Sequence, residues 1–111
     1  MVKADSAYIQ DIAQAITKIE HYCRGVNFKT FSEEEMRHDA VVRQLEIVGE
    51  ATNKLSEDFR KEYPDFPVKE AISMRNFLIH GYNEINLAVV WKTVQEDLPL
   101  LKEHVSKLQS L

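Results

Sequence analysis

The chain has 111 residues, a formal net charge of −4 and one cysteine, Cys23. This length fits one domain, residues 1–111, and a single cysteine excludes an internal disulfide, so we expect a protein of the reducing cytoplasm. The negative charge argues against a broad basic face that coats nucleic acid, and no apolar stretch approaches the roughly 18 residues of a membrane span. No membrane partner is therefore expected.

The first predicted helix begins at Asp5 or Ser6, either of which can act as its capping residue, and ends before Gly25. Its apolar residues recur at alternating steps of three and four, the spacing of one buried helix stripe. They are Ile9, Ile12, Ile16, Ile19 and Cys23. A connection through Asn27 to Phe31 is expected to follow.

The second predicted helix starts at a capping box formed by Ser32 and Glu35. Its stripe consists of Val41, Leu45, Val48, Thr52 and Leu55. Gly49 lies in the middle of this helix, where glycine costs about 1 kcal/mol relative to alanine, so we infer that another backbone crosses close by. The segment Ser56 to Tyr63 either extends the helix or forms a separate turn, and the pattern leaves both options open.

Residues 64–67, Pro-Asp-Phe-Pro, break the chain before a third predicted helix from about Val68 to His80, which Gly81 stops. A fourth helix, from about Asn86 to Gln109, repeats the apolar spacing with an expected kink or restart at Pro99. Its stripe is Leu87, Trp91, Val94, Leu98, Leu101, Val105 and Leu108. Together these stripes predict an all-α fold, an antiparallel up-and-down bundle of four to five helices.

The third helix departs from the one-stripe pattern because apolar residues cover almost its whole circumference. They are Ile72, Met74, Phe77, Leu78 and Ile79. Burial on most sides in so small a bundle indicates a second subunit, which predicts a homodimer. Arg75 lies within this apolar stretch, and a buried guanidinium needs a partner. It could pair with Glu46 or Glu50 as a purely structural contact, or it could meet a dimer cleft or a bound anion.

Each remaining polar residue of this region also has an ordinary structural interpretation. His80 could bond a carbonyl at the end of the helix, and Tyr82 could be a packing residue with its hydroxyl at the surface. Their spacing favours a functional interpretation, since the segment 75–82 has the pattern Arg, four residues, His, one residue, Tyr.

This pattern resembles the signature of HepT toxins in the HEPN superfamily, together with Asn76 and Gly81 inside it. Residues 43–51, 90–91 and 97–101 resemble the surroundings of that signature. One departure is Val68 after Pro67, where members often have Trp. The resemblance implies a helical, commonly dimeric, metal-independent ribonuclease that needs no cofactor.

The residue types fit RNA cleavage without appeal to the family. Attack by the 2′-hydroxyl of RNA needs a base, an acid for the leaving oxygen and positive charge at the phosphate. His80 can transfer protons at cellular pH, and the guanidinium of Arg75 can bind two phosphate oxygens. No metal is expected, because the other histidines are scattered. They are His21, His38 and His104.

Helical geometry sets a constraint on this site. At about 100° per residue, Arg75 and Tyr82 fall within about 20° of each other, but His80 is offset from Arg75 by about 140°. Either the helix end distorts at Gly81, or the two-fold partner completes the site. We favour a composite site with Arg75 and His80 from both chains, in which Asn76, on the face of His80, orients the imidazole. Gly81 and Glu50 are expected to be further supporting residues of this site.

The resemblance also implies a partner, a small nucleotidyltransferase antitoxin that adenylylates the motif tyrosine, here Tyr82. The added phosphodiester would place negative charge where the phosphate of the RNA substrate must lie. Two alternatives remain open: a non-catalytic subunit that binds substrate for a nucleotidyltransferase, and a structural dimerisation bundle in which Arg75 and His80 close a polar network.

Overall fold

Every regular element in a computed structural model of the chain is a helix. The structure describes residues 1–80 and 85–111, and for residues 76–80 it describes the backbone alone. In chain order the elements are α1 (Lys3–Cys23), α2 (Phe28–Glu33), α3 (Glu35–Asn53), α4 (Glu57–Glu62), α5 (Val68–His80), α6 (Leu87–Lys92), the π-helical turn η1 (Thr93–Asp97) and α7 (Leu98–Gln109). The described residues contain no strand, so the all-α prediction is confirmed for them.

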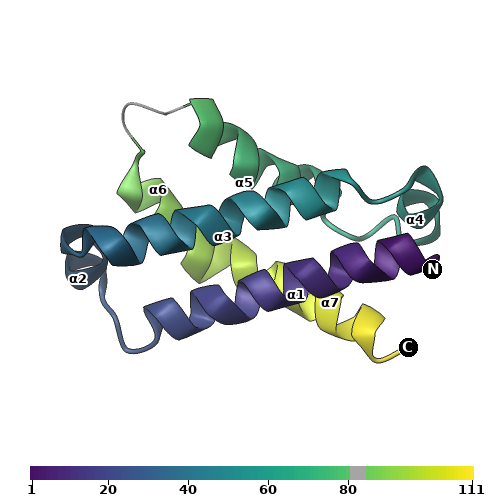
Figure 1. The fold of residues 1–111 in the computed structure, drawn as a ribbon, viewed down its shortest axis with the longest axis horizontal. Coiled ribbons are helices and arrows are strands. Elements are labelled where there is room, and N and C mark those ends of the chain that lie inside the picture. The colour runs from purple at the N-terminus through teal and green to yellow at the C-terminus, as the bar shows by residue number, and fades with distance from the viewer. Residues whose placement is uncertain (81–84) are drawn as a thin grey trace.

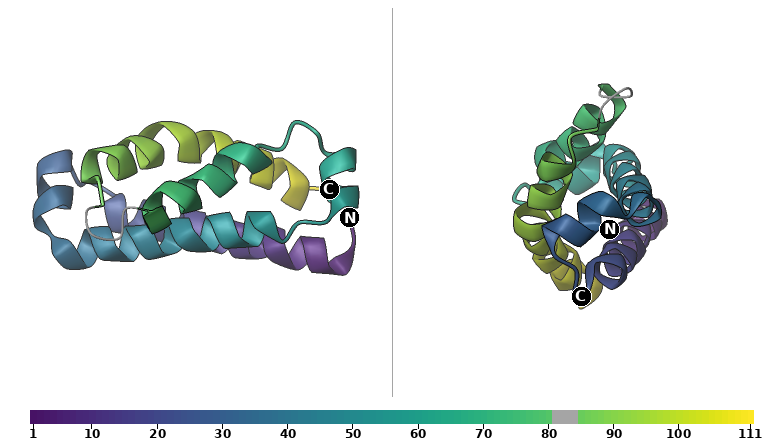
Figure 2. Two further views of the ribbon diagram at one scale, coloured as in Figure 1. Left: turned by 90° about the horizontal axis from the view of Figure 1, so that it is seen from above. Right: turned by 90° about the vertical axis from the view of Figure 1, so that its left-hand side faces the viewer.

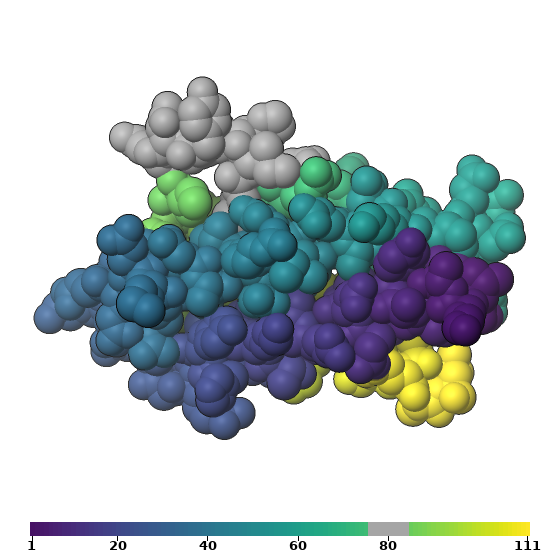
Figure 3. Space-filling model, viewed as in Figure 1, coloured from purple at the N-terminus to yellow at the C-terminus, as the bar shows by residue number. Residues whose placement is uncertain are grey.

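Helix α3 lies at the centre of the arrangement. It runs antiparallel to α1 on one side and packs against α5 on another, while α6, η1 and α7 follow one another, α6 against α2 and α7 against α1 (Figure 1). The short helices α2 and α4 lie at opposite ends of the long axis, and both termini are at the α4 end (Figure 2). Helices α1, α2 and α3 form much of the face seen in Figure 3. None of the described helices is both long and apolar enough to cross a membrane.

The core is built from the stripes that the sequence predicts. From α1 it contains Ile9, Ile12, Ile16 and Ile19, from α3 and its end Val41, Leu45, Val48, Thr52 and Leu55, and from η1 and α7 Val94, Leu98, Leu101, Val105 and Leu108. Cys23, Leu87 and Trp91, the outer members of their stripes, are only partly buried. The three-and-four spacing therefore identified the buried faces correctly.

The predicted cap of α1 is wrong. The helix begins at Lys3, and its capping residue, Val2, offers no side-chain hydrogen bond. Asp5 is instead 2% exposed, and its carboxylate accepts hydrogen bonds from the amide and the hydroxyl of Ser56, at 2.9 Å and 2.6 Å. The Ser56 hydroxyl in turn accepts from the amide of Phe59 and caps α4. A tertiary contact thus takes the carboxylate that local sequence assigns to a cap.

The predicted start of the second helix is also wrong. Asn27 caps a separate short helix, α2, with its side chain accepting from the amide of Thr30 at 2.9 Å. The Ser32 hydroxyl donates to the carbonyl of Lys29, so it caps nothing, and α3 begins at Glu35 without a side-chain cap. The chain forms α2 with the Asn27 cap, and does not start a helix at Ser32, because α2 buries Phe31 completely. The ring of Phe31 packs against the ring of Trp91, with 5.1 Å between the two ring centroids.

Two open points of the sequence interpretation are settled. Residues 57–62 form a separate helix, α4, capped by Ser56, and do not extend α3. The fourth predicted helix is interrupted just before Pro99 by the π-helical turn η1, where the amide of Leu98 bonds the carbonyl of Thr93. Proline has no amide hydrogen to donate, so the regular ladder restarts with Pro99 in the first turn of α7.

Replacing Asp5 by alanine is expected to lower the free energy of unfolding by about 2 kcal/mol, because the amide and hydroxyl of Ser56 would lose a charged acceptor. Urea denaturation of Asp5→Ala and of Asp11→Ala measures this, since Asp11 is exposed on the same helix and should change stability by less than about 0.5 kcal/mol. Equal midpoints for the two variants would contradict a structural role for Asp5.

Candidate active site

Arg75 is the residue of the Arg-x4-His-x-Tyr segment whose side chain the structure describes. It lies on α5 and is half-buried against α3. Ala71 and Met74 of the same helix are 1% and 3% exposed, whereas Lys69 and Ser73 are exposed. The first turns of α5 therefore have a solvent-facing side, and the all-round burial predicted for this helix does not hold for them.

Gly49 of α3 is the point of closest approach between α3 and α5. A Cβ atom at this position would lie 3.3 Å from the Ala71 carbonyl oxygen and 3.3 Å from the Cα of Arg75, and it would overlap the Cβ of Arg75. The prediction that a backbone crosses close to Gly49 is confirmed. The crossing residue is the arginine of the candidate site itself.

The guanidinium of Arg75 does not make the structural ion pair that sequence left open. Glu46 lies 3.5 Å from Arg43 and Glu50 is exposed, and among the described residues neither forms a salt bridge with Arg75. The Nε of Arg75 is buried and has no hydrogen-bond partner among them. A buried donor without a partner costs about 1–3 kcal/mol, so an acceptor bound beside Arg75 would recover this free energy.

The other predicted site residues are only partly placed. His80 is the last residue of α5, as predicted, and Asn76 lies one turn before it. The side chains of both, and all of Gly81 and Tyr82, lie outside the described residues. Glu50, predicted as a supporting residue, is on the exposed side of α3 next to Gly49.

The described residues contain no group of three His, Cys, Asp or Glu side chains that could hold a metal ion. Cys23, a thiol that could act as a nucleophile, is placed unfavourably for that role. Partial burial raises the pKa of its thiol, and this outweighs the opposite effect of the nearby Arg37 cation. Cys23 is therefore mainly protonated at neutral pH, the less reactive form of the group.

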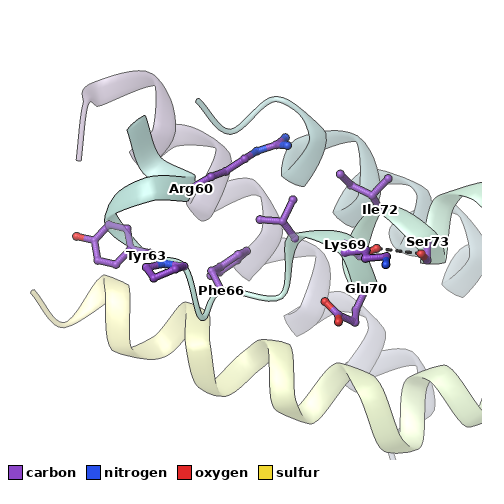
Figure 4. Close-up of a pocket in the computed structure, with 9 residues that line it drawn as sticks. Arg60, Tyr63, Phe66, Lys69, Glu70, Ile72 and Ser73 are labelled. Carbon is purple, nitrogen blue, oxygen red and sulfur yellow. Dashed lines mark hydrogen bonds between the residues drawn. The ribbon is translucent and has the colours of Figure 1, made fainter. Parts of the chain in front are cut away.

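A groove between the end of α4 and the start of α5 is lined by basic and tyrosine side chains that the sequence pattern did not identify as candidate site residues. Its volume is about 670 Å³, and Arg60, Tyr63 and Lys69 are among the side chains that line it (Figure 4). Arg60 is on α4, Tyr63 directly follows that helix and Lys69 is on α5, and the Pro-Asp-Phe-Pro segment joins the two helices. No fixed spacing links these residues, so only the fold could bring them together.

Comparison with known proteins identifies the class to which this helical fold belongs, a class of ribonucleases. A family model described as "Ribonuclease HepT-like" matches residues 12–108. The chain belongs to the HepT-like ribonuclease family.

Curated relatives match almost the whole chain. The "Probable ribonuclease HepT" of Thermococcus cleftensis is 40% identical over 98% of this chain and 99% of its own length. The "Putative RNase MJ1380" of Methanocaldococcus jannaschii is 37% identical over 95% and 97%, respectively. The "Putative RNase TTE0752" of Caldanaerobacter subterraneus is 32% identical over 96% of both chains. No solved structure matches the chain.

Replacing Gly49 by alanine should destabilise the protein, although alanine in a free helix would stabilise it by about 1 kcal/mol. The new methyl group would overlap Arg75 and press on the backbone of α5, at a cost of about 1–3 kcal/mol. Urea denaturation of Gly49→Ala measures the effect, with Glu50→Ala as the exposed control next in sequence. A Gly49→Ala protein more stable than the wild type would rule out the close contact.

Proposed function

We propose that this chain is a metal-independent endoribonuclease that acts as a homodimer, the toxin of a toxin–antitoxin pair. The observation that carries the proposal is the guanidinium of Arg75, half-buried on α5 with a buried Nε that has no partner among the described residues. A phosphate oxygen is an acceptor that such a group can bind strongly. Membership of the HepT-like ribonuclease family supports RNA as the source of that phosphate.

The proposed reaction uses the 2′-hydroxyl of RNA as the nucleophile. A base removes its proton, the 2′-oxygen attacks the adjacent phosphorus, and the bond from phosphorus to the 5′-oxygen breaks as an acid protonates that oxygen. An imidazole can serve as base or acid, and we assign this role to His80. Arg75 stabilises the negative charge that gathers on the phosphate oxygens.

Two subunits would complete this site. Arg75 and His80 are five residues apart on α5, which places them about 140° apart around a regular helix. We propose that an antiparallel up-and-down bundle pairs through α5, so that Arg75 of one chain works with His80 of the other. Asn76 and Gly81 would support the imidazole and the end of the helix, and Glu50 would lie close to the phosphate site.

The proposed antitoxin is a nucleotidyltransferase that transfers an adenylyl group to the hydroxyl of Tyr82. In that transfer the tyrosine oxygen attacks the α-phosphate of ATP and pyrophosphate leaves. The new phosphodiester carries a negative charge two residues from His80, and it would repel the phosphate of incoming RNA.

The alternative function is a non-catalytic subunit that holds substrate for a nucleotidyltransferase. The net charge of −4 suits it, because a free RNA-binding protein is commonly basic. A second alternative is a structural dimer, in which the guanidinium of Arg75 would have its hydrogen-bond partners in a polar network of the core. The absence of an ion pair to Glu46 or Glu50 within the described part of the chain argues against that alternative.

Replacing either His80 or Arg75 by alanine should reduce RNA cleavage by at least about 100-fold while the dimer stays folded, since each removes a group of the transition state. Purified protein and a labelled single-stranded RNA measure this directly, and growth after induction in a bacterial host gives a second readout. Lys18→Ala, an exposed change on α1, is the control. Intact RNA with the wild type as well would favour the two non-catalytic alternatives.

Mixed dimers test whether the site is shared. A dimer of one Arg75→Ala chain and one His80→Ala chain retains one complete site if the residues act across the two-fold axis, so about half of the wild-type activity should return. Within-chain sites would leave both sites of this dimer defective, and no activity would return.

Tyr82→Phe should remain toxic when induced alone but resist adenylylation, because phenylalanine lacks the acceptor oxygen. Mass spectrometry after co-expression with a cognate nucleotidyltransferase should show the adenylyl adduct, about 329 Da for AMP less water, on the wild type and none on the variant. An adduct of equal yield on Tyr82→Phe would place the modification on another residue.

A further inference from the structure

The groove between α4 and α5 has the chemistry of an anion site. Arg60 and Lys69 contribute two cations, and among the described residues neither forms an ion pair with a carboxylate. Ser73 adds a hydroxyl to the lining. Glu70 is the one carboxylate that lines the groove, and in Figure 4 its side chain points toward α7, away from Arg60.

Arg60 has a guanidinium that is fixed in position but only partly hydrogen-bonded, which is unusual for a surface arginine. One of its terminal nitrogens, Nη2, donates to the carbonyl of Asn53 at 3.2 Å, which fixes the guanidinium beside the end of α3. Its Nε is buried and, within the part of the chain described, has no acceptor. Among the residues whose side chains the structure describes, Arg60 and Arg75 are the two that share this condition. Both cations have unused hydrogen-bond donors and border the same helix, α3.

The start of α5 adds to the positive potential of the groove. Lys69, in the first turn of this helix of 13 residues, lines the groove. The first amides of a helix lack intrahelical partners and carry partial positive charge, which favours a bound anion. Two side-chain cations and a helix start therefore act on one hollow in a protein whose net charge is −4.

The groove and the proposed cleavage site lie along the same helix, α5, and both border α3. The carbonyl that holds Arg60 belongs to Asn53, one turn of α3, or about 6 Å, beyond Gly49, and Gly49 contacts Arg75. Along α5, steps of four, three and four residues lead from Lys69 through Ser73 and position 76 to position 80, about 16 Å in all. A chain of phosphates that follows α5 would thus meet the groove and the proposed cleavage site in turn.

We propose that this groove binds backbone phosphates of the RNA strand that is cut at the far end of α5, with Arg60 and Lys69 as the phosphate-binding residues. This inference rests on the proposed ribonuclease function and adds where the strand lies beyond the cut bond. It explains how an acidic protein holds RNA: the positive charge is confined to one short track. The groove contacts phosphate and is expected to read no base sequence.

Binding of a single-stranded RNA of about 15 nucleotides, with every 2′-hydroxyl methylated so that it cannot be cleaved, tests the groove directly. Fluorescence anisotropy of the dimer should show affinity about tenfold weaker for Arg60→Gln combined with Lys69→Gln. The slope of log affinity against log salt should fall by about 1.4, which corresponds to two lost phosphate contacts on a single strand. Lys69→Gln alone should weaken binding by about threefold.

The matched control is Lys18→Gln combined with Arg24→Gln, which removes the same charge from exposed positions of α1 and the residue after it. This pair should leave affinity within about twofold and the salt slope nearly unchanged. Equal losses of RNA affinity in the two double variants would overturn the inference. So would no loss of affinity in the groove pair, the variant that combines Arg60→Gln with Lys69→Gln. So would a groove that binds inorganic phosphate but gives the same strand affinity with and without its cations. Thermal melts verify that both pairs fold.

Cleavage separates this inference from the proposed function. The groove pair should lower kcat/KM for a long RNA about tenfold more than for a dinucleotide, which is too short to reach the groove. His80→Ala should abolish cleavage of both and keep the affinity for the methylated strand. A wild type that cuts neither RNA refutes the ribonuclease proposal. A wild type that cuts both, with equal effects of the groove pair on long and short substrates, refutes the groove alone.

Discussion

The contact between α3 and α5 at Gly49 is the constraint on which the rest of the structure depends. A single hydrogen atom in place of a side chain lets the backbone of α5 come within van der Waals distance of α3. That approach fixes the height of Arg75 above α3 and leaves its guanidinium half-buried. The same approach brings the start of α5 near the end of α3, where Asn53 holds Arg60. The two arginines whose Nε atoms have no partner among the described residues therefore both lie against α3.

Sequence predicts the helices and their buried faces well, because burial follows a period that each helix carries within itself. The isoleucines of α1 are buried as their spacing indicates, and so are the leucines of the predicted α7 stripe, Leu98, Leu101 and Leu108. Sequence predicts helix caps poorly, because a side chain that could cap its own helix can instead bond a distant part of the fold. Asp5 could cap a helix, but its carboxylate instead accepts hydrogen bonds from the amide and the hydroxyl of Ser56, fifty-one positions away. Gly49 lies between these cases, since its isolation in a helix indicates a close neighbour without identifying it.

The candidate site also has one part that sequence spacing could identify and one part that only the fold brings together. Arg75, His80 and Tyr82 are neighbours in sequence on one helix and just beyond it, so their spacing could be recognised. The groove lined by Arg60 and Lys69 combines two helices across a proline-rich connection, and nothing in the order of residues marks it. The roles of His80 and Tyr82 are proposed from their spacing in the sequence and from family membership.

The π-helical turn η1 makes one part of the chain tolerant of changes in length. A π turn accommodates one more residue than an α turn, and here it falls between Val90 and Leu101, which both face the core. A deletion within residues 93–97 can be absorbed by conversion to a regular α turn. A deletion within α1 would rotate the rest of its isoleucine stripe by about 100° away from the core. Single-residue deletions among relatives should therefore collect at η1 and spare α1 and α3.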